Sequence, residues 1–334
     1  MSVVFPVSGS GSFVLIQICY RRFALMKIKS TFPQSSALKW LGSMIFMRLR
    51  VVAVLAGVLF VQTSLALAAP PADVAEARAQ YQKAREHITA GEYEQAVRLL
   101  DEILESSLLD ERERALAHNN RGLAKRRLGD AEGALADYTA AIRSYPAFIN
   151  AYYNRGTLLS AIGRFDEARR DFDFVLSRRP DHAAALYNRG NLLRRAGMPA
   201  EAGADFRKVI DLRPDFAPAY NNLAVVMVAM RQYEQAISLY DRAIALAPES
   251  ATFRYNRANA RYALGDLKGA IADYSKAIAL APSNAAAYYN RGLALERVGM
   301  SKQAMEDFRQ AYAIAPTLSP VAEKIRQIGI IEGQ

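Results

Sequence analysis

The chain has 334 residues, with 43 Lys and Arg against 33 Asp and Glu and a formal net charge of +10. Residues 1–68 hold +7 of that charge and no acidic residue, so the rest carries only +3 and lacks the basic surface that nucleic-acid binding needs. The single cysteine, Cys19, also lies in this leading segment, which excludes disulfides and thiolate chemistry from the remainder.

Residues 47–68 have the layout of a secretory signal peptide. Arg48 and Arg50 precede an apolar run over residues 51–68, and small residues close that run. This layout is typical of a cleaved signal, so we expect cleavage after Ala68 and a periplasmic or secreted protein without a stable membrane span. The alternative is an inner-membrane anchor formed by residues 51–68, which are barely long enough to span a bilayer.

The first 46 residues precede this complete signal layout and show neither helical nor strand periodicity. A signal sequence normally begins a chain. We therefore interpret residues 1–46 as a spurious or disordered N-terminal extension, with translation starting at Met47 or Met44. Residues 69–76 are expected to form a short linker.

From residue 77 onward the sequence repeats with a period of 34 residues. The seven blocks cover residues 77–110, 115–148, 149–182, 183–216, 217–250, 251–284 and 285–318. A four-residue insertion, Glu111–Arg114, separates the first two blocks. Glycine recurs at position 15 of six blocks, at Gly91, Gly129, Gly163, Gly197, Gly265 and Gly299. Each block is therefore expected to form two helices joined by a turn.

Other repeat positions indicate how the two helices of a block pack. Position 8 is always Gly or Ala, which allows two helices to approach closely, and position 20 is always Ala. Position 24 carries Leu or an aromatic residue, so the second helix presents a hole and a knob on one face. Proline ends the second helix of blocks two to seven, at Pro146, Pro180, Pro214, Pro248, Pro282 and Pro316.

The glycine turn, the small residues at the crossing and the terminal proline together resemble the tetratricopeptide repeat family, over residues 77–318. The resemblance implies an all-α, right-handed α-solenoid of seven helix-turn-helix hairpins, with the first helices lining its concave side. Residues 319–334 begin with Ser-Pro and continue with apolar residues at helical spacing, so we expect a capping helix and tail.

Arg at position 7 and Asp at position 23 occur together in five blocks, and a sixth block has Leu at both positions. This joint occurrence predicts that the two positions face each other on antiparallel helices. We therefore favour structural ion pairs over ligand binding for these residues. The expected pairs are Arg121 with Asp137, Arg155 with Asp171, Arg189 with Asp205, Arg257 with Asp273 and Arg291 with Asp307.

Position 6 is asparagine in six blocks, at Asn120, Asn154, Asn188, Asn222, Asn256 and Asn290. An asparagine amide can donate to a carbonyl and accept from an N–H group, so such a ladder suits an extended peptide backbone. In tetratricopeptide proteins that bind extended peptides, asparagines in the corresponding place do this, and the resemblance implies the same here. The alternative is that the asparagines pack neighbouring hairpins or are solvated.

Basic and apolar side chains beside the ladder suggest the character of a ligand. Arg127 in block two and Arg194 and Arg195 in block four favour an acidic segment, and Val225 and Val228 in block five favour an apolar side chain. Solvated arginines are the alternative. Position 2 is not basic in blocks two to seven, so we expect binding along a chain and not capture of its C-terminus.

The three histidines fall at unrelated repeat positions without a carboxylate at ligand spacing, and no catalytic or phosphate-binding motif occurs. We therefore expect no catalytic residue, no metal and no cofactor. The sequence predicts a non-enzymatic protein-protein interaction module that binds a protein or peptide and no nucleic acid. The alternatives are a structural scaffold of a cell-envelope or polysaccharide-export assembly and, less favoured, a protein that binds an anionic glycan.

Overall fold

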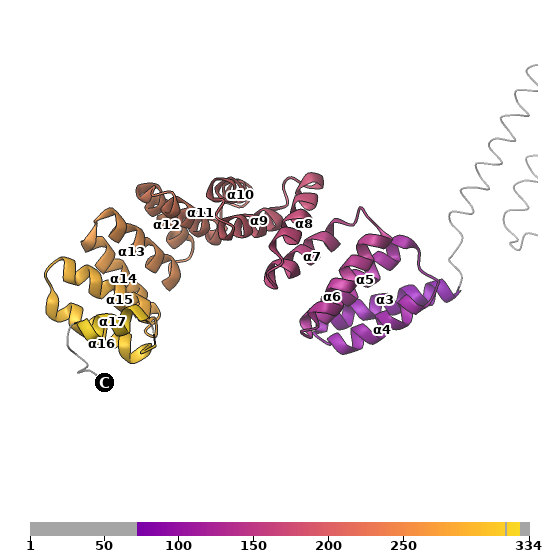
Figure 1. The fold of residues 1–334 in the computed structure, drawn as a ribbon. Helices are drawn as coiled ribbons and strands as arrows, with labels where there is room; N and C mark the ends of the chain where they lie inside the picture. The colour runs from indigo at the N-terminus through magenta and orange to yellow at the C-terminus, as the bar shows by residue number, and fades with distance from the viewer. Residues whose placement is uncertain (1–71, 318, 328–334) are drawn as a thin grey trace, which may run out of the picture. The chain divides into compact units, whose positions relative to one another are not determined.

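The computed structural model describes residues 72–317 and 319–327, and this part consists of helices joined by short turns (Figure 1). The signal-peptide or anchor segment and the N-terminal extension lie outside these residues, as does the tail after Gln327. No described helix is both long enough and apolar enough to cross a membrane.

The described helices are labelled α3 to α17 and form seven hairpins and a final single helix. Their bounds are α3 Ala72–Ala90, α4 Tyr93–Glu105, α5 Glu111–Arg127, α6 Ala131–Ser144, α7 Ile149–Ala161, α8 Phe165–Arg178, α9 Ala183–Arg195, α10 Pro199–Leu212, α11 Ala217–Ala229, α12 Tyr233–Leu246, α13 Ala251–Leu264, α14 Leu267–Leu280, α15 Ala285–Arg297, α16 Ser301–Ile314 and α17 Ser319–Gln327.

Each helix packs against its neighbours in sequence, which makes the fold an all-α solenoid. The first helix of a hairpin contacts its own second helix, and that second helix contacts the first helix of the next hairpin. The first helices of consecutive hairpins also approach one another at all six junctions, more closely than the second helices do. The odd-numbered helices α3 to α15 therefore lie on the inner side of the stack, which we call the inner face.

The core of each hairpin is the contact between repeat positions 8 and 24. The position 24 side chains Tyr138, Phe172, Phe206, Tyr240, Tyr274 and Phe308 are almost fully buried, as is Leu100 in the first hairpin. A Cβ atom placed on Gly190 would lie 2.8 Å from Cε1 of Phe206. Only a residue without a side chain allows this approach of α9 to α10.

The turn between the two helices needs a left-handed residue at position 15. The six glycines there have φ between 73° and 92°. The fifth hairpin has Arg231 instead, at φ 58°, and it is the one non-glycine residue with positive φ in the described part. The same turn geometry therefore forms without glycine, at a cost in backbone strain.

Two helices begin earlier than the repeat boundaries suggest. Helix α3 starts at Ala72, inside the stretch that we expected to be a linker, because residues 72–76 are compatible with a helix and Asp73 lies in its first turn. Helix α5 starts at Glu111, where the side chains of Asp110 and Glu113 form a capping box. The four inserted residues therefore extend α5 by one turn and do not form a loop.

The last helix covers the end of the seventh hairpin. Val321 and Ile325 of α17 are fully buried, and Ile325 packs in one cluster with Leu295 and Phe308. The apolar side of the last hairpin thus has a partner, as a repeat array requires at its end.

Candidate ligand-binding face

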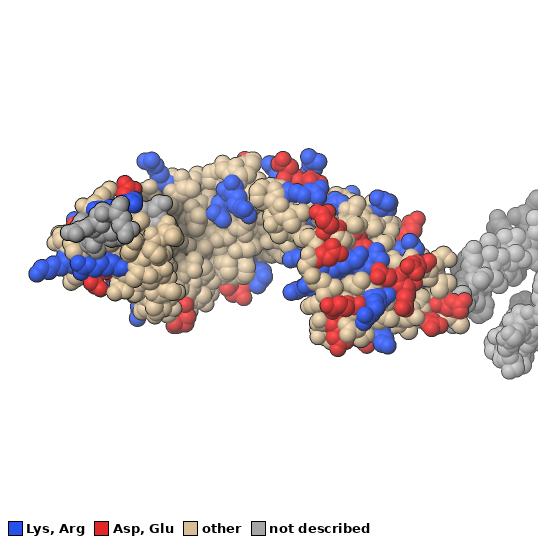
Figure 2. All heavy atoms as spheres, turned by 60° about the horizontal axis from the view of Figure 1, so that its bottom comes forward, with Lys and Arg blue, Asp and Glu red and all other residues tan. Residues whose placement is uncertain are grey.

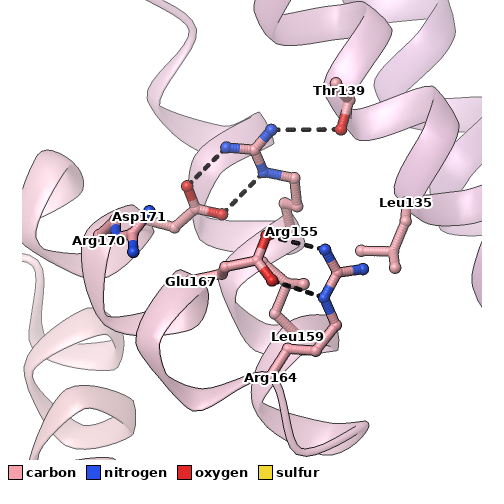
Figure 3. Close-up of a pocket in the computed structure, with 8 residues that line it drawn as sticks. All are labelled: Leu135, Thr139, Arg155, Leu159, Arg164, Glu167, Arg170 and Asp171. Atoms are coloured by element: carbon pink, nitrogen blue, oxygen red, sulfur yellow. Dashed lines mark hydrogen bonds and ion pairs between the residues drawn. The ribbon is translucent and has the colours of Figure 1, made fainter.

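The arginines at position 7 pair with the aspartates at position 23 of their own hairpins. In Figure 3, Nε and Nη2 of Arg155 both donate to the carboxylate of Asp171, over 2.9 and 2.8 Å. All five expected pairs are present with N···O distances of 2.5 to 2.8 Å: Arg121 with Asp137, Arg155 with Asp171, Arg189 with Asp205, Arg257 with Asp273 and Arg291 with Asp307. Each aspartate is nearly buried, so the pairs replace solvation of the carboxylates.

The same arginines also join neighbouring hairpins, which the sequence did not lead us to expect. Nη1 of Arg189 donates to Asp173 of the preceding hairpin over 2.7 Å, and Nη1 of Arg155 reaches Thr139 over 3.2 Å. The acceptors stand at position 25 of the preceding block and are Asp101, Thr139, Asp173, Asp241 and Ser275. We call each of these three-residue arrangements a clamp.

The junction between the fourth and fifth hairpins has no clamp. In the fifth block, position 7 is Leu223 and position 23 is Leu239, and position 25 of the fourth block is Arg207. A hollow of about 480 Å³ opens here, lined by these residues and by Met227. A block has an acceptor side chain at position 25 when the following block has arginine at position 7. The sequence shows this relation only when each block is compared with the next one.

The clamp around Asp137 has the strongest electrostatic effect. Burial alone would raise the pKa of this carboxyl, but hydrogen bonds from His118, Arg121 and Lys125 outweigh burial and hold its pKa well below the usual range. Its carboxylate accepts from Arg121 Nε over 2.9 Å and lies 2.9 Å from Lys125 Nζ. For Arg155 the hydrogen bonds to Asp171 raise the pKa further. The charges of the clamps are therefore satisfied within the fold.

The asparagines at position 6 are half-buried on the first helices and donate hydrogen bonds to the preceding hairpin. Asn120 Nδ2 donates to the Tyr81 hydroxyl over 2.8 Å, and Asn154 Nδ2 donates to Asn119 Oδ1 over 2.9 Å. The pattern holds at all six junctions, with further acceptors Tyr153 and Thr157 for Asn188, Tyr187 and Asn191 for Asn222, Asn221 for Asn256, and Tyr255 and Asn259 for Asn290.

The asparagine oxygens are used less than the nitrogens. Oδ1 of Asn120 accepts from Asn119, and Oδ1 of Asn222 accepts from Asn221. Within residues 72–317 and 319–327, no side chain or backbone group donates to Oδ1 of the other four, which are Asn154, Asn188, Asn256 and Asn290. The ladder therefore offers hydrogen-bond acceptors, while its donors hold the hairpins together.

The arginines beside the ladder lie differently from those of the clamps. Arg127 and Arg195 are exposed, with the Arg195 guanidinium 4.7 Å from the ring centre of Phe165. Arg194 is half-buried, and its Nε is buried without a hydrogen-bond partner. No carboxylate of the described part lies within 4.0 Å of these three arginines.

The two apolar residues that we expected beside the ladder, Val225 and Val228, are on α11. Val225 and Val228 are half-buried and pack against the cluster that contains Leu193 and Tyr240. On the face seen in Figure 2, acidic and basic side chains intermingle near the N-terminal hairpins, and uncharged residues cover much of the middle. The face of the molecule seen in Figure 2 carries no continuous stripe of one charge.

Nothing in the described part has the make-up of a catalytic or metal centre. No group of three His, Cys, Asp or Glu residues is placed to hold a metal ion there. The hollow in Figure 3, of about 170 Å³, is lined by the Arg155–Asp171 and Arg164–Glu167 pairs, which satisfy each other. The repeated groups on the inner face are the stronger candidate for a site.

Comparison with known proteins agrees with this architecture. Family models described as TPR repeat or tetratricopeptide repeat match residues 81–147, 153–216, 193–260, 258–299 and 285–318. No curated protein sequence matches the chain.

Several solved structures have the same fold. A tetratricopeptide repeat protein from Parabacteroides merdae is 22% identical over 75% of this chain and 97% of its own, with a TM-score of 0.57. The C-terminal part of a TPR repeat-containing protein from Cytophaga hutchinsonii is 18% identical over 73% of this chain and 98% of its own, with a TM-score of 0.58. MamA from Desulfovibrio magneticus is 26% identical over 52% of this chain and 97% of its own, with a TM-score of 0.50. Since the family models match along the stack of hairpins and the fold agrees, the chain is a tetratricopeptide repeat protein.

Proposed function

We propose that this protein is a periplasmic or secreted adaptor that binds an extended, acidic polypeptide segment along its inner face. Tetratricopeptide repeat proteins are protein-protein interaction modules, and the matches to this chain are to models of that repeat. The proposed location rests on the signal-peptide layout of residues 47–68.

The observation that carries the proposal is the row of open carbonyl acceptors. Oδ1 of Asn154, Asn188, Asn256 and Asn290 has no donor in the described part, although the nitrogen of each side chain is engaged. An extended peptide presents backbone N–H groups at regular intervals and would satisfy such acceptors whatever its side chains. We propose that the asparagines accept from the bound backbone and do not donate to it.

Arginines and valines give the proposed segment its character. Arg127, Arg194 and Arg195 have no carboxylate partner in the described part, so an acidic side chain would supply one. Val225 and Val228 are half-buried, so an apolar side chain of the partner would complete their burial.

The test must separate binding from hairpin packing, because each asparagine takes part in the packing. Asn188→Ala removes both the open oxygen and the donor. The double variant Tyr153→Phe with Thr157→Val removes the two intramolecular acceptors of Asn188 and leaves its oxygen in place. Both variants lose the same contacts between hairpins, so the double variant is a matched control.

Each variant serves as bait for proteins cross-linked and purified from the cell envelope. We expect Asn188→Ala to lower capture of the partner at least tenfold, and the protein with Tyr153→Phe and Thr157→Val to retain it. Circular dichroism checks that helix content is unchanged. Equal capture by the parent, the asparagine variant and the control would refute the proposal. An equal loss of capture in the asparagine variant and the control would show that the asparagines act only in the packing of hairpins.

A further inference from the structure

The hollow between the fourth and fifth hairpins lies on the outer side of the stack, away from the asparagine ladder. Its floor is apolar and includes Leu223 and Met227 of α11, each 5% exposed, together with the half-buried Ile210 and Leu239. Its rim consists of exposed polar side chains of the second helices α10 and α12, which are Arg207, Asp211, Gln235 and Ser238. No residue of the asparagine ladder lines it, so a ligand here would be independent of the proposed function.

The equivalent hollow between the second and third hairpins shows what occupies this space when a clamp is present (Figure 3). Six lining positions are common to the two hollows: 7, 11, 19, 22 and 23 of the later block and 25 of the earlier one. Where Arg155 pairs with Asp171, the hollow measures about 170 Å³. Where Leu223 and Leu239 stand instead, it measures about 480 Å³. Loss of the clamp therefore goes with a larger hollow and an apolar floor.

An aromatic ring is also uncovered at this junction. In the third and seventh hairpins the clamp arginine lies against the ring at position 4, with Arg155 5.7 Å from the ring centre of Tyr152 and Arg291 5.7 Å from that of Tyr288. Position 4 of the fifth hairpin is Tyr220, and Leu223 provides no such cationic cover. The ring of Tyr220 lines the hollow and adds an aromatic surface to its floor.

The size and the open rim of the hollow fit a side chain of a protein partner. An apolar cavity of about 150 Å³ is large enough to bind benzene, so this hollow has room for a phenylalanine or leucine side chain. A small-molecule site usually encloses most of its ligand. Here the rim residues on α10 and α12 are exposed, so one side of the hollow is open. A protein surface would fill the hollow with one side chain and cover the rim at the same time.

The charges of the rim indicate what should flank that side chain. Arg207 and Asp211 stand one turn apart on α10, and neither lies within 4.0 Å of an opposite charge in the described part. The opposite rim offers only the neutral side chains of Gln235 and Ser238. One acidic and one basic side chain placed one helical turn apart on a partner would pair with both charges of α10.

We infer that the hollow with Arg207 and Asp211 at its rim docks an amphipathic helix of a partner protein. This helix inserts one large apolar side chain over Leu223, Met227 and Tyr220. Beside that side chain it carries an acidic residue for Arg207 and a basic residue for Asp211. The outer side of the stack thus holds a second binding site, distinct in place and chemistry from the inner face.

The test uses the full chain with ¹³C-labelled methionine methyl groups and synthetic alanine-based helical peptides. In one peptide Glu and Lys stand four residues apart with Phe directly before Lys, in the second the two charges are exchanged, and in the third Ala replaces Phe. The methyl signal of Met227 reports on the floor, and that of Met305 on α16 serves as reference. We expect the Met227 signal alone to move, with one charge order bound at least fivefold more tightly than the other and the Ala peptide at least tenfold more weakly.

Exchange of the two rim charges gives a matched variant. Arg207→Asp combined with Asp211→Arg alters only exposed side chains and keeps the net charge of the chain. It should invert the preference between the two charge orders, an outcome that a merely structural role would not give. An unmoved Met227 signal with every peptide, equal binding of the two orders, or an unchanged preference in this variant would overturn the inference.

Restoration of the clamp tests the hollow itself. Leu223→Arg and Leu239→Asp, combined with Arg207→Thr, reproduce the residues that Arg155, Asp171 and Thr139 supply one junction earlier. This variant should bind each peptide at least tenfold more weakly and remain folded, as judged by urea unfolding. A folded variant that binds as the parent does would also overturn the inference. Since no residue of the asparagine ladder is changed, failure here leaves the proposed function to be judged by its own test.

Discussion

Replacement of Gly292 by alanine tests whether the contact between positions 8 and 24 sets the geometry of a hairpin. A Cβ atom on Gly292 would lie 2.6 Å from Cε1, 2.9 Å from Cδ1 and 3.0 Å from Cζ of Phe308. The ring is 1% exposed and packs in one cluster with Leu295 and Ile325, so it cannot move aside without disturbing the contact with α17.

Two opposing terms determine the size of the effect. An extra carbon in a close-packed core costs about 1–3 kcal/mol. Alanine in a helix interior is more favourable than glycine by about 1 kcal/mol, which offsets part of that cost. We expect Gly292→Ala to lower the free energy of unfolding by about 1–2 kcal/mol, because the ring is enclosed and the upper part of the packing cost applies.

Urea unfolding followed by circular dichroism at 222 nm measures this difference. Gly203→Ala is the matched control, since Gly203 is also inside a helix but its added Cβ would first meet the flexible end of Arg207 at 3.4 Å. The control should gain about 0.5–1 kcal/mol from helix propensity alone. A Gly292→Ala protein as resistant to urea as the parent would refute the packing argument.

Two further substitutions test the turn and the clamp. Arg231→Gly should raise the free energy of unfolding by about 1 kcal/mol, because a left-handed backbone is strained for arginine and not for glycine; a decrease seen by urea unfolding would contradict this. Asp137→Asn should lower it by about 3 kcal/mol at pH 7, because a buried neutral amide would face Arg121, Lys125 and His118. The folded-state pKa of Asp137 lies below the unfolded one, so its contribution is present above about pH 4 and lost as the pH falls further. Urea unfolding between pH 7 and pH 3 should therefore show a decreasing difference in free energy of unfolding between the parent and the Asp137→Asn protein. A difference that stays constant with pH would contradict the lowered pKa of Asp137.

The contacts within a hairpin were largely accessible to sequence reasoning, and those between hairpins were not. Stacking the blocks shows that Arg at position 7 occurs with Asp at position 23, and the structure pairs them. The same alignment does not reveal the third member of each clamp, because Asp173 accepts a hydrogen bond from Arg189, which belongs to the following block. A contact between repeats becomes visible only when one block is compared with the next.

The asparagine ladder shows the same limit in chemical terms. An amide can donate, accept or do both, and the sequence does not show which groups its neighbours offer. In the structure the hydroxyls of Tyr81, Tyr187 and Tyr255 take the donors, which leaves acceptors as the open groups. The start of α3 at Ala72 was missed for a different reason, since its first residues precede the repeat pattern that defined the boundary.

The junction at Leu223 gives the array a change of chemistry near its middle. In a repeat protein, stability is approximately the sum of each unit's own stability and the coupling between nearest neighbours. A clamp arginine contributes to that coupling at five of the six junctions, through an ion pair at three of them and through a hydrogen bond to Thr139 or Ser275 at the other two. Apolar contact replaces the clamp between the fourth and fifth hairpins. Added salt screens partly exposed ion pairs and leaves apolar contacts in place. Added salt should therefore weaken the coupling between hairpins inside the first group of four and inside the last group of three, at the junctions that hold an ion pair, and leave the apolar link between the two groups unchanged.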